Sequence, residues 1–352
     1  MVKKLAVLLA AVMMIGTLAG CGTSTADYST TVVATYGDEN IYMDEANFFL
    51  RYQQWYQEGS YWDMYTLYFG YTDMWDAESG NGTQTMGQYL KEETMAQILQ
   101  TRILMDHADE MGVSLTDEDK AQVAEAVSTF KLSVAEEFQQ YAPYTDEALT
   151  EWLEKNALAI KVWDAVKKSK EVEVTDEESE MFTVEYAYIS ATSEDAEVEE
   201  GTLVNEELAN EALARLQAGE EFADFEEELG LTSYTNSYLK KDDSMTIALY
   251  TTGVNMKTGD VQVAGDAENG WYVIKCVSDL DEEATEQKRA EVADSKQEEY
   301  FNEVYTGWAA SAKAFEVKSS WNDVKFSGEK IYVAAETTAA ETTAAEETTA
   351  AE

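Results

Sequence analysis

The hydrophobic period of the chain changes near Thr175, and this change limits the folds that the sequence can adopt. Across residues 44–166, apolar side chains recur at helical spacing, as in Leu149, Leu153 and Ile160. Beyond Thr175, the residues Phe182, Val184, Tyr186 and Tyr188 alternate with other residues, which predicts a strand. The chain therefore combines a long helical part with a later part that mixes helices and strands.

The N-terminus has the pattern of a secretory signal. Lys3 and Lys4 precede an apolar run from Leu5 to Ile15, and small residues lead to Cys21. This ending resembles the lipobox of bacterial lipoproteins. The resemblance implies a diacylglyceryl group on Cys21, cleavage before it, and an extracytoplasmic protein tethered to a membrane. A transmembrane anchor is the alternative, but the run is shorter than the roughly 20 residues that span a bilayer.

The charge balance excludes one class of partner. The chain has 70 acidic and 24 basic residues, for a formal charge of −46. Nucleic acid is therefore not expected as a partner, because binding it requires Lys and Arg to neutralise phosphates. The acids are spread along the whole chain, which favours a role in solubility, and attraction of basic clients is the alternative.

Few residues can carry catalysis or bind metals. Cys276 is the only cysteine besides Cys21, and His107 is the only histidine. One histidine without a thiol pair does not make a zinc site, and no Gly-x-Ser-x-Gly motif accompanies it for a catalytic triad. We therefore expect neither a metal nor a cofactor.

Further elements are predicted along the chain. A helix should begin with Asp44 as its N-cap, and Thr116 should cap another helix. The remaining expected elements are helices at 206–217, 222–229 and 282–313, and strands at 31–35, 271–277, 315–317 and 324–326. Residues 334–352 repeat Ala, Glu and Thr without apolar periodicity, which predicts a disordered acidic tail.

The order of these elements resembles the PrsA/SurA-type extracytoplasmic foldases. The strings that carry the resemblance are Val33–Ile41, Gly112–Asp119, Ala218–Phe225, and Lys257–Val261 followed by Asn269–Lys275. Together they cover about residues 31–326. The resemblance implies an α+β architecture, namely a mainly helical SurA N-like chaperone domain with an inserted parvulin-like α/β domain.

The resemblance also implies domain boundaries. A signal peptide at 1–20 and a tether at 21–30 precede the body of the protein. The helical chaperone domain would comprise 31–177 and be completed by the C-terminal helix and strands at 281–333. The parvulin-like domain would comprise 178–280, and the disordered tail 334–352.

Parvulins are peptidyl-prolyl isomerases that usually carry two histidines beside the substrate. By the resemblance, these positions fall on Tyr188 and Tyr272. The segment between Leu229 and Val261 also departs from the family pattern. We therefore expect isomerase activity to be weak or absent. The two tyrosines could keep a hydrogen-bonding pair across the site, since each hydroxyl both donates and accepts.

Aromatic residues and methionines indicate where clients would bind. They are dense between Tyr61 and Trp75, where no helical stripe is clean, and the candidate client-binding residues are Trp62, Tyr65, Phe69 and Met245. Burial in the core is the alternative for this stretch. For Phe48, Tyr52, Trp55 and Tyr56, which share one helix face, we expect burial in the core.

These patterns favour a lipid-anchored extracytoplasmic foldase whose partners are unfolded or partly folded secreted polypeptides. An active peptidyl-prolyl isomerase is the main alternative. A solute-binding lipoprotein would need two lobes with repeated parallel strands, and the sequence lacks such repetition. A structural surface lipoprotein is suggested only by the tail.

Overall fold

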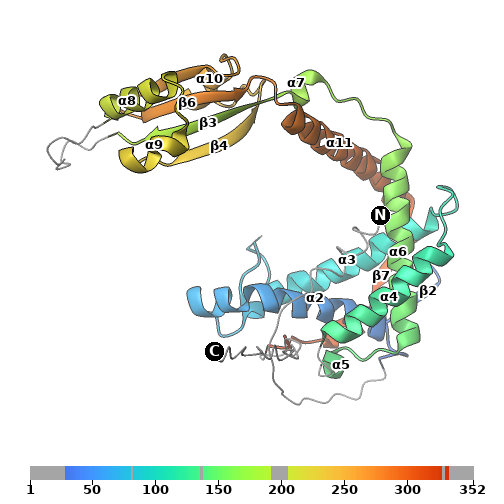
Figure 1. Cartoon of the computed structure of the whole chain (residues 1–352). Helices are drawn as coiled ribbons and strands as arrows, with labels where there is room; N and C mark the ends of the chain where they lie inside the picture. The colour runs from blue at the N-terminus through green and yellow to red at the C-terminus, as the bar shows by residue number, and fades with distance from the viewer. Residues whose placement is uncertain (1–27, 81, 135–137, 192–204, 327–329, 333–352) are drawn as a thin grey trace, which may run out of the picture. The chain divides into compact units, whose positions relative to one another are not determined.

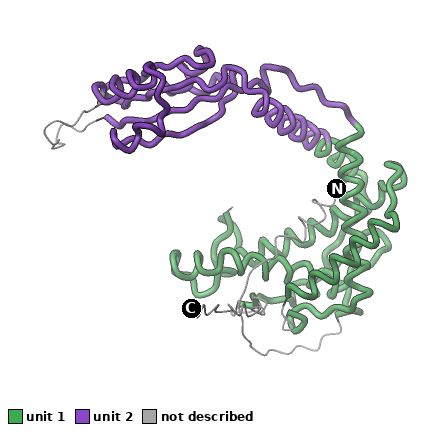
Figure 2. Tube along the Cα trace, viewed as in Figure 1, with its two compact units in different colours: residues 1–169, 301–352 green, residues 170–300 purple. Residues whose placement is uncertain are grey.

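The computed structural model describes residues 28–80, 82–134, 138–191, 205–326 and 330–332. The chain divides into two compact units, which Figure 2 distinguishes by colour. Unit 1 comprises residues 1–169 and 301–352, and unit 2 comprises residues 170–300. The expected signal peptide (1–20), Cys21 and the tail (334–352) lie outside the described residues.

Unit 1 is mainly helical. Its helical elements are α2 (Met43–Asp63), η1 (Met64–Tyr68), η2 (Met74–Asp76), α3 (Met86–Asp106), α4 (Asp117–Ser133), α5 (Phe138–Tyr141), α6 (Asp146–Ser169) and η3 (Ser319–Asp323). The unit also contains the end of α11 (Glu282–Ser311). Thr116 caps α4 as expected, because its hydroxyl accepts a hydrogen bond from the Asp119 N–H. No described helix is long and apolar enough to cross a bilayer.

A small antiparallel sheet joins the two ends of the chain in unit 1. It contains β1 (Val32–Tyr36), β2 (Glu39–Tyr42) and β7 (Phe315–Val317), in the order β2-β1-β7. Ala34 of β1 is paired with Val317 of β7. Residues separated by most of the chain therefore complete the same sheet.

Two apolar clusters form the core of unit 1. The first lies under the small sheet and includes Ile41, Leu50, Ile98 and Trp321. The second lies among α2, α4 and α6 and is rich in aromatic rings, among them Phe48, Trp55, Phe130 and Trp152. The expected burial is confirmed for Phe48 and Trp55, whereas Tyr52 is half-buried and Tyr56, at the edge of this helix face, is exposed.

A buried ion pair fixes α3 against α2 and β2. The side chain of Arg102 is 2% exposed and donates to both carboxylate oxygens of Glu45, at 2.9 and 2.8 Å. Its Nε donates to Glu39 at 2.7 Å. A charge at this depth is tolerated because two carboxylates balance it and accept its hydrogen bonds.

Unit 2 contains a four-stranded antiparallel sheet with the order β4-β3-β6-β5, of which Figure 1 labels β3, β4 and β6. The strands are β3 (Met181–Ile189), β4 (Ser233–Leu239), β5 (Val261–Asp266) and β6 (Gly270–Ser278). The helices are α7 (Asp176–Ser179), α8 (Asn205–Gln217), α9 (Phe222–Leu229), α10 (Ala248–Gly253) and the larger part of α11, residues 282–300.

The two faces of this sheet are covered differently. Ala187 and Val273 point to the face that α8 and α9 cover, where they pack with Phe222 and Phe225. Phe182 and the alternate positions of β3 point to the opposite face, where α10 contributes Leu249 and Tyr250. Because α10 is only six residues long, part of this second face stays open.

Two expectations about local structure are wrong. Helix α2 begins at Met43, so that Asp44 lies in the first turn, where its carboxylate accepts the Glu45 N–H at 2.8 Å. Residues 324–326 form no strand. The carbonyl oxygens of Val324 and Lys325 instead accept hydrogen bonds from the side chains of Lys91 and Arg51, so these carbonyls bond to side chains and not to a neighbouring strand.

Candidate functional site

The end of helix α2 carries an exposed group of large apolar side chains, which we call the aromatic tip (residues 61–71). The α-helix changes there to the π-helical turn η1, in which the Phe69 N–H donates to the Met64 carbonyl oxygen at 3.3 Å. Gly70 follows with a φ of 74°, a conformation that favours glycine and ends the helix. Short π-helical turns occur frequently at functional sites.

Within the aromatic tip, exposure differs strongly between residues. Leu67, Tyr68 and Phe69 are 76, 87 and 62% exposed. Trp62 and Tyr65 are half-buried and pack against the first core cluster of the unit. Leu67 and Tyr68, the two most exposed apolar residues of this segment, were not among the residues predicted from the sequence to bind clients. Their position after the last turn that packs on the core was the signal that could have found them.

The aromatic tip ends where the chain returns to the core. Trp75 is buried, and its ring stacks on Phe326 with 4.8 Å between centroids. The buried alternative therefore applies to this tryptophan. The exposed group is confined to the segment that precedes it.

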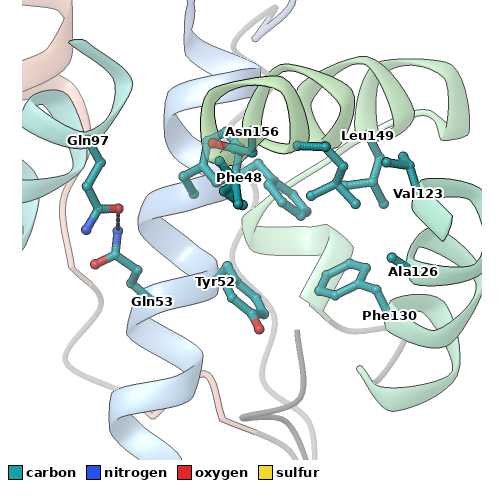
Figure 3. Close-up of a pocket in the computed structure, with 13 residues that line it drawn as sticks. Phe48, Tyr52, Gln53, Gln97, Val123, Ala126, Phe130, Leu149 and Asn156 are labelled. Atoms are coloured by element: carbon teal, nitrogen blue, oxygen red, sulfur yellow. Dashed lines mark hydrogen bonds between the residues drawn. The ribbon is translucent and has the colours of Figure 1, made fainter. Parts of the chain in front are cut away.

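A second feature of unit 1 is an apolar cavity of about 290 Å³ (Figure 3). Phe48 and Tyr52 of α2, Phe130 of α4 and Leu149 of α6 form its walls, and Gln53 donates to Gln97 at 3.0 Å at one side. An apolar cavity of about 150 Å³ already holds benzene, so this one has room for an aromatic side chain.

The ionisation of Tyr52, whose ring forms part of the cavity wall, tests whether its hydroxyl is buried. Burial, with a smaller contribution from Tyr56, raises the pKa of Tyr52 to about 12. The folded state thus favours the neutral phenol. The contribution of this phenol to the free energy of unfolding is complete below pH 10 and is lost as the pH rises toward 12. Between these pH values, we expect the free energy of unfolding to fall by on the order of 2 kcal/mol more in the wild type than in Tyr52→Phe. Urea unfolding across this range measures the difference, and parallel curves for the two proteins would contradict the burial of the hydroxyl.

In unit 2, the structure brings Tyr188 and Tyr272 together. They are directly paired on β3 and β6, and their rings lie 4.9 Å apart at an angle of 44°. The Tyr188 hydroxyl donates to the carbonyl oxygen of Asn269 at 2.9 Å, so the two residues meet through their rings. The adjacent Gly270 permits this approach, because a Cβ there would lie 2.6 Å from the Tyr188 hydroxyl.

More tyrosines share this face of the sheet. Tyr234 is paired with Tyr186, and their ring centroids lie 6.0 Å apart. Asn236 donates to the hydroxyl of Tyr186 at 3.1 Å. Met245 is half-buried under the same face, against the cluster that contains Phe182 and Leu249. Met245 therefore lies in unit 2, whereas Trp62, Tyr65 and Phe69 lie in unit 1.

The chemistry of this tyrosine face is limited. Burial raises the pKa of Tyr272, with Tyr188 adding to the shift, and burial also raises the pKa of Tyr186. These hydroxyls therefore stay protonated near neutral pH and can donate hydrogen bonds but not act as bases. Burial likewise raises the pKa of the Cys276 thiol, which disfavours the reactive thiolate. The described residues contain no cluster of three or more potential metal ligands.

Comparison with known proteins gives matches at the level of solved structures. No family model and no curated protein matches the chain. The chain is similar to PrsA foldases and SurA-like chaperones. PrsA from Bacillus subtilis is 16% identical, with a TM-score of 0.24, over 69% of this chain and 94% of that chain.

Two further similar structures cover more of the chain. Foldase protein PrsA from Lactococcus lactis is 13% identical, with a TM-score of 0.32, over 83% of this chain and 96% of that one. A SurA-like chaperone from Campylobacter jejuni is 10% identical, with a TM-score of 0.28, over 82% of this chain and all of that one. Likeness at this level does not assign an activity, so the side chains of this protein must carry the functional conclusion.

Proposed function

We propose that this protein is a folding chaperone that binds unfolded secreted polypeptides outside the cytoplasm. The observation that carries the proposal is the aromatic tip, where Leu67, Tyr68 and Phe69 are mostly exposed. A contiguous group of exposed apolar side chains is typical of a binding surface. Aromatic and methionine side chains suit varied clients, because they give large contact areas without requiring one sequence.

Charge indicates which clients would bind best. Residues 52–90 contain no Lys or Arg, their exposed acidic residues are Asp63, Asp76 and Glu78, and the whole chain has a formal charge of −46. Such a surface attracts positively charged chains over a distance of about one Debye length, roughly 8 Å at physiological salt. Lys and Arg side chains can also contact the faces of aromatic rings. We therefore expect apolar segments flanked by basic residues to bind more tightly than acidic ones.

The direct test uses the full chain purified from the cell envelope. It should suppress the aggregation of a chemically denatured model protein and bind that protein in its unfolded form but not in its folded form. Added salt should weaken binding to a basic model protein more than binding to a neutral one. A protein that neither suppresses aggregation nor retains any unfolded polypeptide would contradict the proposal.

Membrane anchoring through Cys21 and the domain functions are parts of the same proposal. The signal pattern at residues 1–20 supports the anchor, and mass spectrometry of the mature N-terminus tests it, with Cys21→Ala as the variant that should lose the lipid. We assign chaperone activity to the helical domain, 31–177 with 281–333, and treat 178–280 as a parvulin-like domain with altered chemistry.

We predict that this protein accelerates proline-limited refolding by less than about twofold. The uncatalysed isomerisation takes roughly tens to hundreds of seconds. The sole histidine, His107, lies in the other unit, and the positions where histidines are expected hold Tyr188 and Tyr272. Refolding of a model protein with a native cis-proline, followed by fluorescence, measures the rate. A clear acceleration that survives Tyr188→Phe would place catalysis elsewhere and remove any role for this hydroxyl.

A further inference from the structure

The last described residues of the chain, Lys330–Tyr332, are bound by a buried carboxylate of helix α2. Glu58 is fully buried, and its Oε2 accepts hydrogen bonds from the main-chain N–H groups of Ile331 and Tyr332, at 2.7 and 2.8 Å. Its Oε1 accepts from Trp75 Nε1 and Gln54 Nε2, both at 2.8 Å. Two of the four hydrogen bonds of this carboxylate therefore go to main-chain groups that any residue except proline can offer.

The side chains of Ile331 and Tyr332 each pack into a defined position on unit 1. Ile331 is 2% exposed and packs in the second core cluster of unit 1. The ring of Tyr332 lies 5.1 Å from that of Trp55 and crosses Gly59, where a Cβ would come within 2.7 Å of the ring. A glycine inside a helix is otherwise unfavourable, so its presence here is explained by the aromatic ring that it accommodates.

Ile331 belongs to a core cluster that includes some of the side chains lining the cavity. Phe48 and Phe130 contact that cluster and also line the cavity of about 290 Å³ (Figure 3). The apolar cluster that contains Ile331 thus also borders unfilled space. A longer polypeptide could occupy both the position of Ile331 and the cavity.

Recognition of this kind is tolerant of sequence. Glu58 bonds to main-chain groups, and Lys330–Tyr332 themselves belong to neither a helix nor a strand. Main-chain hydrogen bonds together with side-chain pockets are a recurrent way to bind peptides of varied sequence. We propose that the Glu58 site is a polypeptide-binding site that the chain fills in cis with Lys330–Tyr332. Client segments that place an aliphatic residue before an aromatic one compete for it.

This competition rests on the chaperone function proposed above, and it adds a second binding position and a means of control. The cis segment is tethered, so its effective concentration is high, of the order of millimolar for short linkers. Only clients that bind well, or that also engage the aromatic tip, would displace it. The site would thus remain covered in the absence of clients.

The experiment uses the full chain and a fluorescent peptide with the sequence of residues 328–335. In the variant Ile331→Ser/Tyr332→Ser, the two apolar positions are emptied, and we expect the peptide to bind at least about tenfold more tightly than to the wild type. Adding Gly59→Ala to this variant should abolish the gain, because the methyl group fills the tyrosine position. A peptide with N-methyl groups at the positions of Ile331 and Tyr332 should not bind.

The control variant is Leu132→Ser, which changes an exposed apolar residue of α4 and should leave peptide binding at the wild-type level. If the double serine variant folds but binds the peptide no better than the wild type, the segment is a structural part of the core and the inference is wrong. If the double serine variant unfolds, the wild type decides the matter: saturable peptide binding that Gly59→Ala weakens supports the site, and its absence overturns it.

Binding of an unfolded protein is measured in parallel to separate the two proposals. Peptide binding without any binding of unfolded protein would retain the cis site and reject the chaperone function. Binding of unfolded protein that is equal in wild type and double variant, without peptide binding, would do the reverse.

Discussion

Replacing Leu67, Tyr68 and Phe69 together with serine will lower the affinity for unfolded polypeptide at least about tenfold and leave the fold intact. Fully burying one such side chain is worth about 1.5–3 kcal/mol, and a tenfold change in affinity corresponds to 1.4 kcal/mol. The three residues are mostly exposed in the free protein, so their removal creates no cavity in the core. Fluorescence anisotropy of a labelled, permanently unfolded protein measures the affinity, and thermal unfolding checks the fold.

The matched control is again Leu132→Ser, because Leu132 is 80% exposed in the same unit but lies outside the aromatic tip. Its affinity should stay within about twofold of the wild type, since surface substitutions usually change little. Trp62→Ala serves as the contrast: its side chain packs on the core, so thermal stability should fall. Equal loss of affinity in the triple variant and in Leu132→Ser would mean that the aromatic tip is not a specific surface.

Arg102→Met will destabilise the protein by about 3–5 kcal/mol, the cost of leaving a buried charge without its partner. The side chain of Glu45 is 7% exposed, and its carboxylate would lose the two hydrogen bonds from Arg102 Nη2 and the positive charge that balances it. For a unit of about this size, each kcal/mol lowers the melting temperature by roughly 2–4 °C. Urea unfolding of the full chain and of the variant measures the change, and the unit 1 transition should move.

A double variant distinguishes this mechanism from loss of packing. Arg102→Met with Glu45→Met removes both charges, and we expect it to recover most of the lost stability. Lys131→Met removes the exposed pair with Asp146 at 2.7 Å and should cost less than about 1 kcal/mol. If the double variant is as unstable as Arg102→Met alone, the ion pair does not explain the effect.

Elements with strong local signals were predictable from the sequence. The capping box at Thr116 and the apolar alternation from Phe182 onward both correspond to observed elements. Strand β4 was not predicted, because Tyr234, Asn236 and Tyr238 alternate with Ser and Thr and most of the strand is exposed. Its position depends on pairing with β3, which is a tertiary effect that local periodicity does not contain.

The candidate sites were predictable in part. The density of aromatics between Tyr61 and Trp75 pointed to the aromatic tip, but its π-helical turn decides which side chains face solvent. The binding of Lys330–Tyr332 by Glu58 had no local signal, because the partners are more than 270 positions apart. Contacts of this separation depend on the assembled fold.

The pairing of β1 with β7 has a consequence for the order in which this protein matures. A polypeptide is made from its N-terminus, and Ala34 must wait for Val317 before the small sheet of unit 1 can close. Unit 2, by contrast, is formed by the continuous stretch 170–300 and can be completed first. During synthesis, the aromatic-rich helices of unit 1 are therefore present before β7, the strand that completes their sheet, has been made. During that interval, the nascent chain needs the same protection against aggregation that we propose the folded protein gives to its clients.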